Sequence, residues 1–272
     1  MAGHLYIVGT PIGNTLDITA RAVETLKSAD LIACEDTRHT KILLDKYDIK
    51  TQTTSYHKFN IKTKTAFLIN KIKTGCRVAL VSDAGMPGIS DPGQELVKAA
   101  AEEGVKVEVV PGASALISAI SVSGLRTDRF VFEGFLPMKP SLRKELLQAL
   151  ANEERTIILY EAPHRILRTL EELKGAFGDR NVCVARELTK KFEEVSRGRL
   201  TEMIKKFSST KPRGEFVLVI EGEKRIDKVS VDPAILVKDL VDAGVSKSSA
   251  VKIVAKRLKV SKNGLYRASL KD

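Results

Sequence analysis

Glycine and proline residues follow several apolar runs of the sequence, where they are suited to enclose a small ligand. Residues 9–14, 81–93 and 110–115 each combine glycine with proline. None of these segments matches GxGxxG or GxxxxGK[S/T], the patterns whose glycines bring backbone N–H groups to a pyrophosphate. Three such turns at one edge of a sheet predict a rigid wall for a small ligand, although each one alone is also explained as an ordinary turn.

The segment at 81–93, VSDAGMPGISDPG, is the most constrained of the three. Its glycines and prolines leave little conformational entropy to lose when a ligand binds. Asp83 is expected at a strand end, where its carboxylate can face a cation or accept a hydrogen bond from a hydroxyl or amine. The two aspartates of the segment are equally suited to cap the following helix. No set of His or Cys residues accompanies them, so no metal site is predicted.

Three further segments place acidic and basic side chains together where apolar runs end: CEDTRH (34–39), YEAPHR (160–165) and ARELTKK (185–191). A carboxylate or imidazole at such a place can accept a proton, and an arginine can hold a phosphate or stabilise an alkoxide. In the first two segments an arginine follows the carboxylate by a few residues, which is also the pattern of a salt bridge that fixes a loop. Both interpretations stay open from the residues alone.

The apolar runs that position these segments alternate with amphipathic stretches. Over residues 1–122, runs such as HLYIV, DLIAC and RVALV are separated by helical patterns, which predicts a largely parallel, helix-covered sheet. Residues 123–223 repeat the alternation, but the runs at 194–200 and 215–222 are close enough for an antiparallel pair, so this half is predicted to be mixed. The predicted fold class is therefore α/β, with two α/β domains and a cleft for a ligand between them.

The remaining residues, 224–272, are predicted to form a small, basic, helical domain. The chain has 45 Lys and Arg against 34 Asp and Glu, and 12 of those bases with 5 of those acids lie here, a net charge of +7 out of +11. Short helices joined by tight turns resemble a helix-turn-helix, with Lys252, Lys256 and Arg257 largely off the apolar face. Nucleic-acid contact is the favoured interpretation, and a structural cap on the body is the alternative.

Composition excludes several other classes of protein. Hydrophobic residues make up 43% and charged residues 29%, as in an ordinary globular protein rather than a disordered or fibrous one. No run reaches about 18 apolar residues, so no membrane span is predicted, and the first residues lack a secretion-signal pattern. The three cysteines are odd in number and far apart, which favours a reducing, cytoplasmic location.

The sequence resembles the ribosomal RNA methyltransferase branch of the tetrapyrrole methylase superfamily in seven strings that occur in order: VGTPIGNTLDIT, CEDTRHT, VSDAGMPGISDPG, VPGASA, YEAPHR, ARELTKKFEE and GEFVLVIEG. The resemblance spans residues 4 to about 223, and the tail resembles the basic helical C-terminal domain of that branch. The superfamily's usual GDP turn is represented here by Ser82-Asp83-Ala84-Gly85, a departure shared with the branch.

The resemblance implies a homodimer whose domain cleft binds S-adenosylmethionine. The implied reaction is 2′-O-methylation of a cytidine in the decoding region of 16S ribosomal RNA, in the small ribosomal subunit. Methyl transfer from a sulfonium needs alignment of donor and acceptor and a base for the hydroxyl, but no metal. By matching motifs, the cofactor is expected to contact nine residues: Pro11, Asp83, Ala84, Gly85, Ile89, Ser114, Ala115, Tyr160 and Ala162.

For that reaction, Asp36, Glu161 and His164 are predicted to handle the proton. RNA contacts are predicted for six basic residues: Arg38, Arg165, Arg186, Lys252, Lys256 and Arg257. Two rival functions remain. A methylase of a tetrapyrrole or other small molecule leaves the basic tail without a role, and a non-catalytic RNA-binding assembly factor leaves the Gly/Pro/Asp segments without one.

Overall fold

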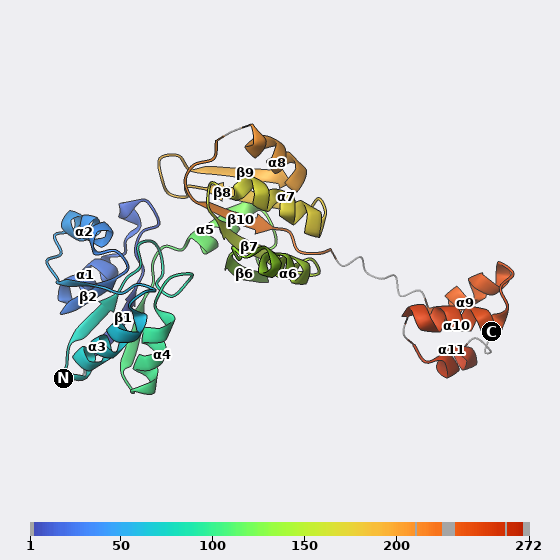
Figure 1. Cartoon of the computed structure of the whole chain (residues 1–272), viewed down its shortest axis with the longest axis horizontal. Helices are drawn as coiled ribbons and strands as arrows, with labels where there is room; N and C mark the ends of the chain where they lie inside the picture. The colour runs from blue at the N-terminus through green and yellow to red at the C-terminus, as the bar shows by residue number, and fades with distance from the viewer. Residues whose placement is uncertain (1–2, 210, 225–231, 259, 269–272) are drawn as a thin grey trace. The chain divides into compact units, whose positions relative to one another are not determined.

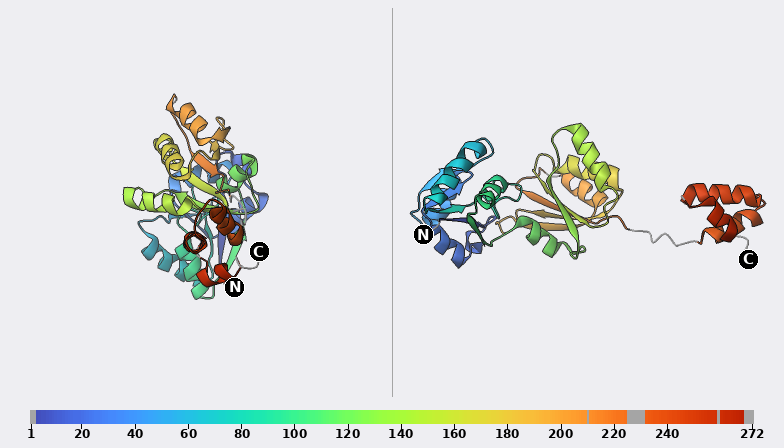
Figure 2. Two further views of the ribbon diagram at one scale, coloured as in Figure 1. Left: turned by 90° about the vertical axis from the view of Figure 1, so that its right-hand side faces the viewer. Right: turned by 90° about the horizontal axis from the view of Figure 1, so that it is seen from below.

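The computed structural model describes residues 3–209, 211–224, 232–258 and 260–268 (Figures 1 and 2). The chain divides into a body that ends at Glu223 and a tail that begins at Lys224. The body contains two five-stranded sheets, each with helices on both faces. The predicted fold class, two α/β halves followed by a small helical region, is confirmed. Among the described residues no helix combines the length and the apolar character needed to cross a membrane.

The first sheet has the strand order β3-β2-β4-β1-β5, and all neighbouring strands are parallel. Its strands are β1 (His4–Val8), β2 (Leu31–Cys34), β3 (Thr53–Ser55), β4 (Arg77–Leu80) and β5 (Lys106–Val110). Its helices are α1 (Ala20–Ser28) and α2 (Thr37–Lys46) on one face, and α3 (Ile61–Lys73) and α4 (Gln94–Glu102) on the other. Because the strands are parallel, their carboxyl ends meet at one edge, and the loops that follow β1, β2, β4 and β5 lie there.

The second sheet has the order β6-β7-β10-β8-β9, in which β6 and β7 are parallel and the other neighbours antiparallel. Its strands are β6 (Phe130–Phe135), β7 (Thr156–Glu161), β8 (Asn181–Arg186), β9 (Glu194–Arg199) and β10 (Phe216–Ile220). The mixed character is as predicted, but the expected pairing of 194–200 with 215–222 is wrong, because β8 lies between β9 and β10. All of β10 is buried, which suits a central strand, whereas β9 is partly exposed throughout and forms an edge.

Helices α6 (Pro140–Leu150), α7 (Ile166–Phe177) and α8 (Leu200–Ser208) cover one face of the second sheet. The opposite face is covered by α5 (Ala115–Ser123), which follows directly from β5 of the first sheet. Leu116, Ala119 and Ile120 of α5 are its buried contacts with the second sheet. The boundary proposed from the sequence, at 122/123, falls at the end of this helix. By packing, α5 belongs with the second half.

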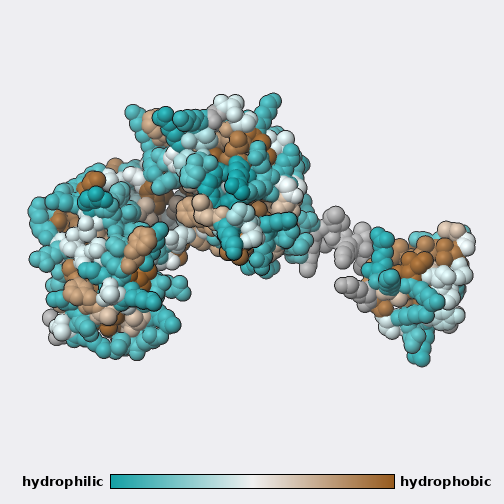
Figure 3. All heavy atoms as spheres, viewed as in Figure 1, coloured by the Kyte–Doolittle hydropathy of each residue, from teal (hydrophilic) through white to brown (hydrophobic). Residues whose placement is uncertain are grey.

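The tail consists of α9 (Pro233–Asp242), α10 (Lys247–Leu258) and α11 (Lys262–Ala268), which enclose a small core of their own. Asp232 caps α9 by accepting a hydrogen bond from the Ala234 N–H at 2.9 Å. Val251 and Val254 of α10 are buried as its apolar spacing predicts, but Leu258 is exposed. Figure 3 shows hydrophobic residues bordered by hydrophilic ones on the visible face of the tail.

Candidate functional site

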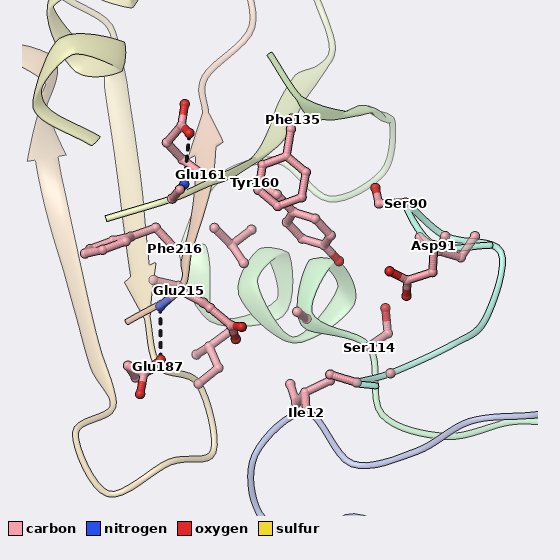
Figure 4. A pocket seen from close by; sticks show the side chains of 18 of the residues that line it. Ile12, Ser90, Asp91, Ser114, Phe135, Tyr160, Glu161, Glu187, Glu215 and Phe216 are labelled. Carbon is pink, nitrogen blue, oxygen red and sulfur yellow. Dashed lines mark hydrogen bonds between the residues drawn. The ribbon is translucent and has the colours of Figure 1, made fainter. Parts of the chain in front are cut away.

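A cavity of about 370 Å³ lies between the two halves of the body (Figure 4). The first half contributes Ile12 and residues 84–86, 89–91 and 114–115, which belong to the loops at the carboxyl edge of the first sheet. The second half contributes side chains from β6, β7 and β10 and from the loop that follows β8. The volume is that of a site for a small molecule. The expectation of a cleft walled by Gly/Pro loops is met by this cavity.

The loops that form the first wall are tied to one another by their backbones. The Thr10 N–H donates to the Gly85 carbonyl at 2.9 Å, and the Gly85 N–H donates to the Thr10 carbonyl at 3.1 Å. Gly85 has a φ of +81°, and a Cβ there would lie 3.3 Å from Ile12. A Cβ on Gly9 would lie 2.7 Å from the backbone of Gly112, so these two loops touch only because both residues are glycine.

Asp91 has two further carboxylates near it, Glu35 and Asp83, neither of which lines the cavity. Asp91 lines the cavity, and its carboxylate points into it (Figure 4). Burial, and after it the charge of Glu35, raise the pKa of Asp91 to about 6, although a hydrogen bond with Ser82 acts to lower it. Burial and the charge of Asp83 likewise raise the pKa of Glu35. Asp91 is missing from the site residues predicted from the sequence. Its position as the second aspartate of the Gly/Pro segment VSDAGMPGISDPG is the sequence signal that could have identified it.

The second half places a lysine between two carboxylates on the opposite wall. The Lys190 Nζ donates to Glu187 at 3.0 Å and to Glu215 at 2.9 Å. The Glu215 N–H also donates to Glu187 at 3.0 Å (Figure 4). Burial acts to lower the pKa of Lys190, but the hydrogen bonds with both glutamates outweigh it and raise the pKa. One ammonium faces two carboxylates here, and with Asp91 the cavity has an excess of negative charge. Such a cavity favours a positively charged ligand.

Three aromatic rings complete the second wall: Phe135, Tyr160 and Phe216. The Tyr160 ring lies edge-on to Phe135 at 5.7 Å and to Phe132 at 4.9 Å between centroids. Its hydroxyl points toward the side of the cavity that holds Asp91 and Ser114 (Figure 4). Burial raises the pKa of Tyr160, so the phenol is neutral and acts as a hydrogen-bonding group.

Most of the residues expected to contact a cofactor lie together around the cavity. Asp83 does not line it: its Oδ1 accepts a hydrogen bond from the Asp36 N–H at 3.1 Å and ties the loop after β4 to the start of α2. Pro11 is buried between Thr10 and Ile12 and does not line it either. Seven of the nine predicted residues do line the cavity: Ala84, Gly85, Ile89, Ser114, Ala115, Tyr160 and Ala162.

Asp36, expected to handle a proton, is the N-cap of α2. Its carboxylate accepts a hydrogen bond from the Arg38 N–H at 2.8 Å and forms a salt bridge with the Arg38 guanidinium at 3.0 Å. These contacts lower the pKa of Asp36 to about 2. A carboxylate with so low a pKa accepts a proton poorly near neutral pH. Arg38 is exposed, as an RNA-contacting residue would be, but it is paired with Asp36.

Glu161, also expected to handle a proton, has a side chain with 0% exposure. Its Oε1 accepts hydrogen bonds from the Ala162 N–H at 2.9 Å and lies 3.1 Å from the Arg165 Nε. Its Oε2 accepts from the Thr169 hydroxyl at 2.5 Å and lies 3.9 Å from Arg143. This carboxylate therefore holds the turn after β7 onto α6 and α7, and Arg165 is committed to internal partners.

The other predicted residues are spread over the surface. His164 is exposed in the turn before α7, next to Pro163 of the cavity wall. Arg186 donates to the Arg213 carbonyl at 2.7 Å and lies 3.5 Å from Glu194. The three basic residues predicted on the tail are all exposed on α10: Lys252, Lys256 and Arg257. Among the described residues no cluster of His, Cys, Asp and Glu is arranged to hold a metal ion.

Comparison with known proteins assigns this architecture to a family. The family model "Tetrapyrrole (Corrin/Porphyrin) Methylases" matches residues 4–204. Curated relatives named "Ribosomal RNA small subunit methyltransferase I" include one from Synechocystis sp., 52% identical over 98% of both chains. One from Haemophilus influenzae is 43% identical over 99% of this chain and 97% of its own. One from Thermotoga maritima is 48% identical, and the match covers 82% of this chain and all of that relative.

Solved structures agree on the fold. A cobalt precorrin-4 methyltransferase of cobalamin biosynthesis superposes with a TM-score of 0.63 at 20% identity, over 80% of this chain and 94% of its own. A diphthine synthase superposes with a TM-score of 0.61 at 15% identity, over 81% of this chain and 90% of its own. At these identities the likeness concerns the fold alone.

Proposed function

Since this chain belongs to the tetrapyrrole methylase family and is a methyltransferase that uses a methyl donor, we propose that the donor is S-adenosylmethionine and the acceptor is small-subunit ribosomal RNA. The finer proposal is 2′-O-methylation of a cytidine in the decoding region of 16S ribosomal RNA, at position 1402 in the common numbering. The observation that supports it most is identity of 43–52% over nearly the full length of relatives with that rRNA methyltransferase name.

The residues of the cavity fit S-adenosylmethionine. When bound, this group supplies an electrophilic methyl group on a positively charged sulfur. Asp91, Glu187 and Glu215 give the cavity the excess negative charge that a sulfonium and an ammonium require. Ala84 and Gly85 allow close approach to the backbone, and the volume of about 370 Å³ suits a ligand of this size.

The protein's own part in the reaction is to align the acceptor and receive its proton. Of the three residues predicted for the proton, Asp36 is held ionised by Arg38, and Glu161 is buried against two arginines. His164 is exposed beside Pro163 at the cavity wall. We therefore assign proton acceptance to His164, and to Glu161 the positioning of the turn that presents it.

The predicted partners follow from the same assignment. The tail is proposed to contact RNA phosphates through α10, where Lys252, Lys256 and Arg257 are exposed. The homodimer and the cytoplasmic location stay predictions. A small-molecule methylase is the second candidate, but solved methyltransferases of that kind are only 20% and 22% identical to this chain.

The decisive experiment offers two RNA acceptors to the full-length protein with isotopically labelled S-adenosylmethionine. The first is a 16S decoding-region RNA, and the second carries 2′-deoxycytidine at the target position. We expect label in the first only, with nearly equal binding of both, because the 2′-hydroxyl is the sole difference. Label in the deoxy substrate would move the reaction to the base. Absence of label in both, together with transfer to a tetrapyrrole, would favour the small-molecule methylase.

A further inference from the structure

Residues 49–82 of the first half carry more positive charge per residue than the tail does. Between Asp48 and Asp83 the chain contains seven Lys or Arg residues and no Asp or Glu. Three of the seven form salt bridges: Lys50 with Asp48, Lys73 with Glu103, and Arg77 with Asp30. In the described part of the chain, four form none: Lys58, Lys62, Lys64 and Lys71.

Exposed aromatic rings lie among these four lysines. Phe59 is 84% exposed, with the Lys58 Nζ 5.0 Å from its ring centroid. Phe67 is 41% exposed, with Lys64 at 5.0 Å and Lys71 at 5.8 Å from its centroid. We call these five residues the α3 face. Rings that can stack on bases, set among ammonium groups that form no salt bridge with the described residues, are typical of surfaces that bind single-stranded nucleic acid.

The α3 face begins at the same edge of the first sheet as the cavity. Strand β3 pairs in parallel with β2, and the Tyr56 N–H that follows β3 donates to the Cys34 carbonyl at 2.7 Å. Strand β2 pairs in turn with β4, whose loop contains Asp91. Two strand spacings separate β3 from β4, about 10 Å. Burial raises the pKa of Glu35, and the charge of Lys58 opposes that rise, so Lys58 lies near Glu35, which in turn lies near Asp91 of the cavity.

The loop that presents Phe59 is held in place by internal hydrogen bonds. The Asn60 side chain accepts from the His57 N–H at 2.9 Å and donates to the Ser55 carbonyl at 3.2 Å. The Asn60 carbonyl also accepts a hydrogen bond from the Lys64 N–H at 2.9 Å, which joins this loop to the first turn of α3. A preformed loop loses little conformational entropy when it binds.

We propose that the α3 face binds the RNA strand next to the nucleotide that is methylated, with Phe59 stacked on a base and the lysines paired with phosphates. This inference rests on the proposed function and adds a contact surface on the body to the one proposed on the tail. The absence of any acid from residues 49–82 makes a polyanion the complementary partner. An acidic protein surface would not need the two exposed rings.

The test measures binding of a single-stranded 16S decoding-region RNA by full-length variants at several salt concentrations. Lys58→Gln, Lys64→Gln and Lys71→Gln combined should reduce the slope of log K against log salt by about 2, since each lost phosphate contact removes about 0.7. The control, which changes net charge equally, combines substitutions on other helices: Lys27→Gln, Lys144→Gln and Lys205→Gln. It should change the slope little.

The ring is tested separately. Phe59→Ala should weaken RNA binding about tenfold, and Phe59→Tyr should leave it unchanged, because a tyrosine ring also stacks. All variants should bind S-adenosylmethionine as the wild type does. Equal salt slopes for the triple variant of the α3 face and for its control would overturn this inference, and so would unaltered RNA affinity in Phe59→Ala. In either case, methylation of the RNA by the wild type would still support the proposed function. A wild type that neither binds nor methylates this RNA would overturn both.

Discussion

Replacing Asp91 by asparagine tests the electrostatic character of the cavity. The pKa of Asp91 is raised from an ordinary value of 3.8 to about 6, mainly by burial. A difference of about two units corresponds to about 3 kcal/mol, and screening by water at this half-buried carboxylate reduces it to about 1–2 kcal/mol. Because the pKa is higher in the folded protein, ionisation of Asp91 destabilises the fold. The loss of stability is absent below about pH 4, develops as pH rises, and is complete above about pH 6.

We therefore expect Asp91→Asn to increase the free energy of unfolding by about 1–2 kcal/mol at pH 7.5 and to leave it unchanged near pH 4. The same change should weaken binding of S-adenosylmethionine about tenfold at pH 7.5, because a carboxylate that faces the cationic donor is lost. Wild-type affinity should fall as pH is lowered through about 6, whereas the variant's should not. Urea denaturation and isothermal titration between pH 4 and pH 8 measure both effects.

Asp30→Asn is the matched control, because hydrogen bonds with Arg77 lower the pKa of Asp30 instead of raising it. That carboxylate stabilises the fold above its ordinary pKa, so its loss should reduce stability at pH 7.5 and leave donor binding unchanged. A lower stability of Asp91→Asn than of the wild type at pH 7.5, or wild-type donor affinity of this variant at every pH, would contradict the electrostatic role assigned to Asp91.

Three further changes test other parts of the structure. Glu161→Ala leaves Arg143 and Arg165 without their buried partner, so it should lower the free energy of unfolding, measured by urea denaturation, by about 3–5 kcal/mol. A wild-type value would show that this network of charged side chains does not stabilise the fold. Gly85→Val places a β-branched residue at a φ of +81°, so it should abolish donor binding in calorimetry while the circular dichroism spectrum stays unchanged. Normal donor affinity in this variant would show that the ligand binds elsewhere. A chain ending at Glu223 should stay folded and bind the donor, because the body has its own hydrophobic cores. Its RNA affinity should depend less steeply on salt than that of the full chain, and equal salt slopes would exclude the tail from RNA binding.

The sequence alone predicted the alternation of strands and helices and the wall formed by the Gly/Pro loops. Both depend on local properties: apolar periodicity selects the element, and the residues after a strand set the turn. Parallel strands bring their carboxyl ends to one edge, so loops distant in the chain, such as those at Gly85 and Ser114, were expected together and both line the cavity. The family, too, was recognisable from strings that stand in these loops.

Only the tertiary structure decided which charged groups are available for chemistry. Asp36, Glu161 and Asp91 are the same kind of group in the sequence, yet one is paired with an exposed arginine, one is buried between two arginines, and one faces the cavity. Their neighbours come from other elements, and burial and pairing, not residue type, set the pKa of a carboxylate. Likewise the position of β8 between β9 and β10 follows from burial of β10 on both faces, a property of the assembled sheet that spacing along the chain does not contain.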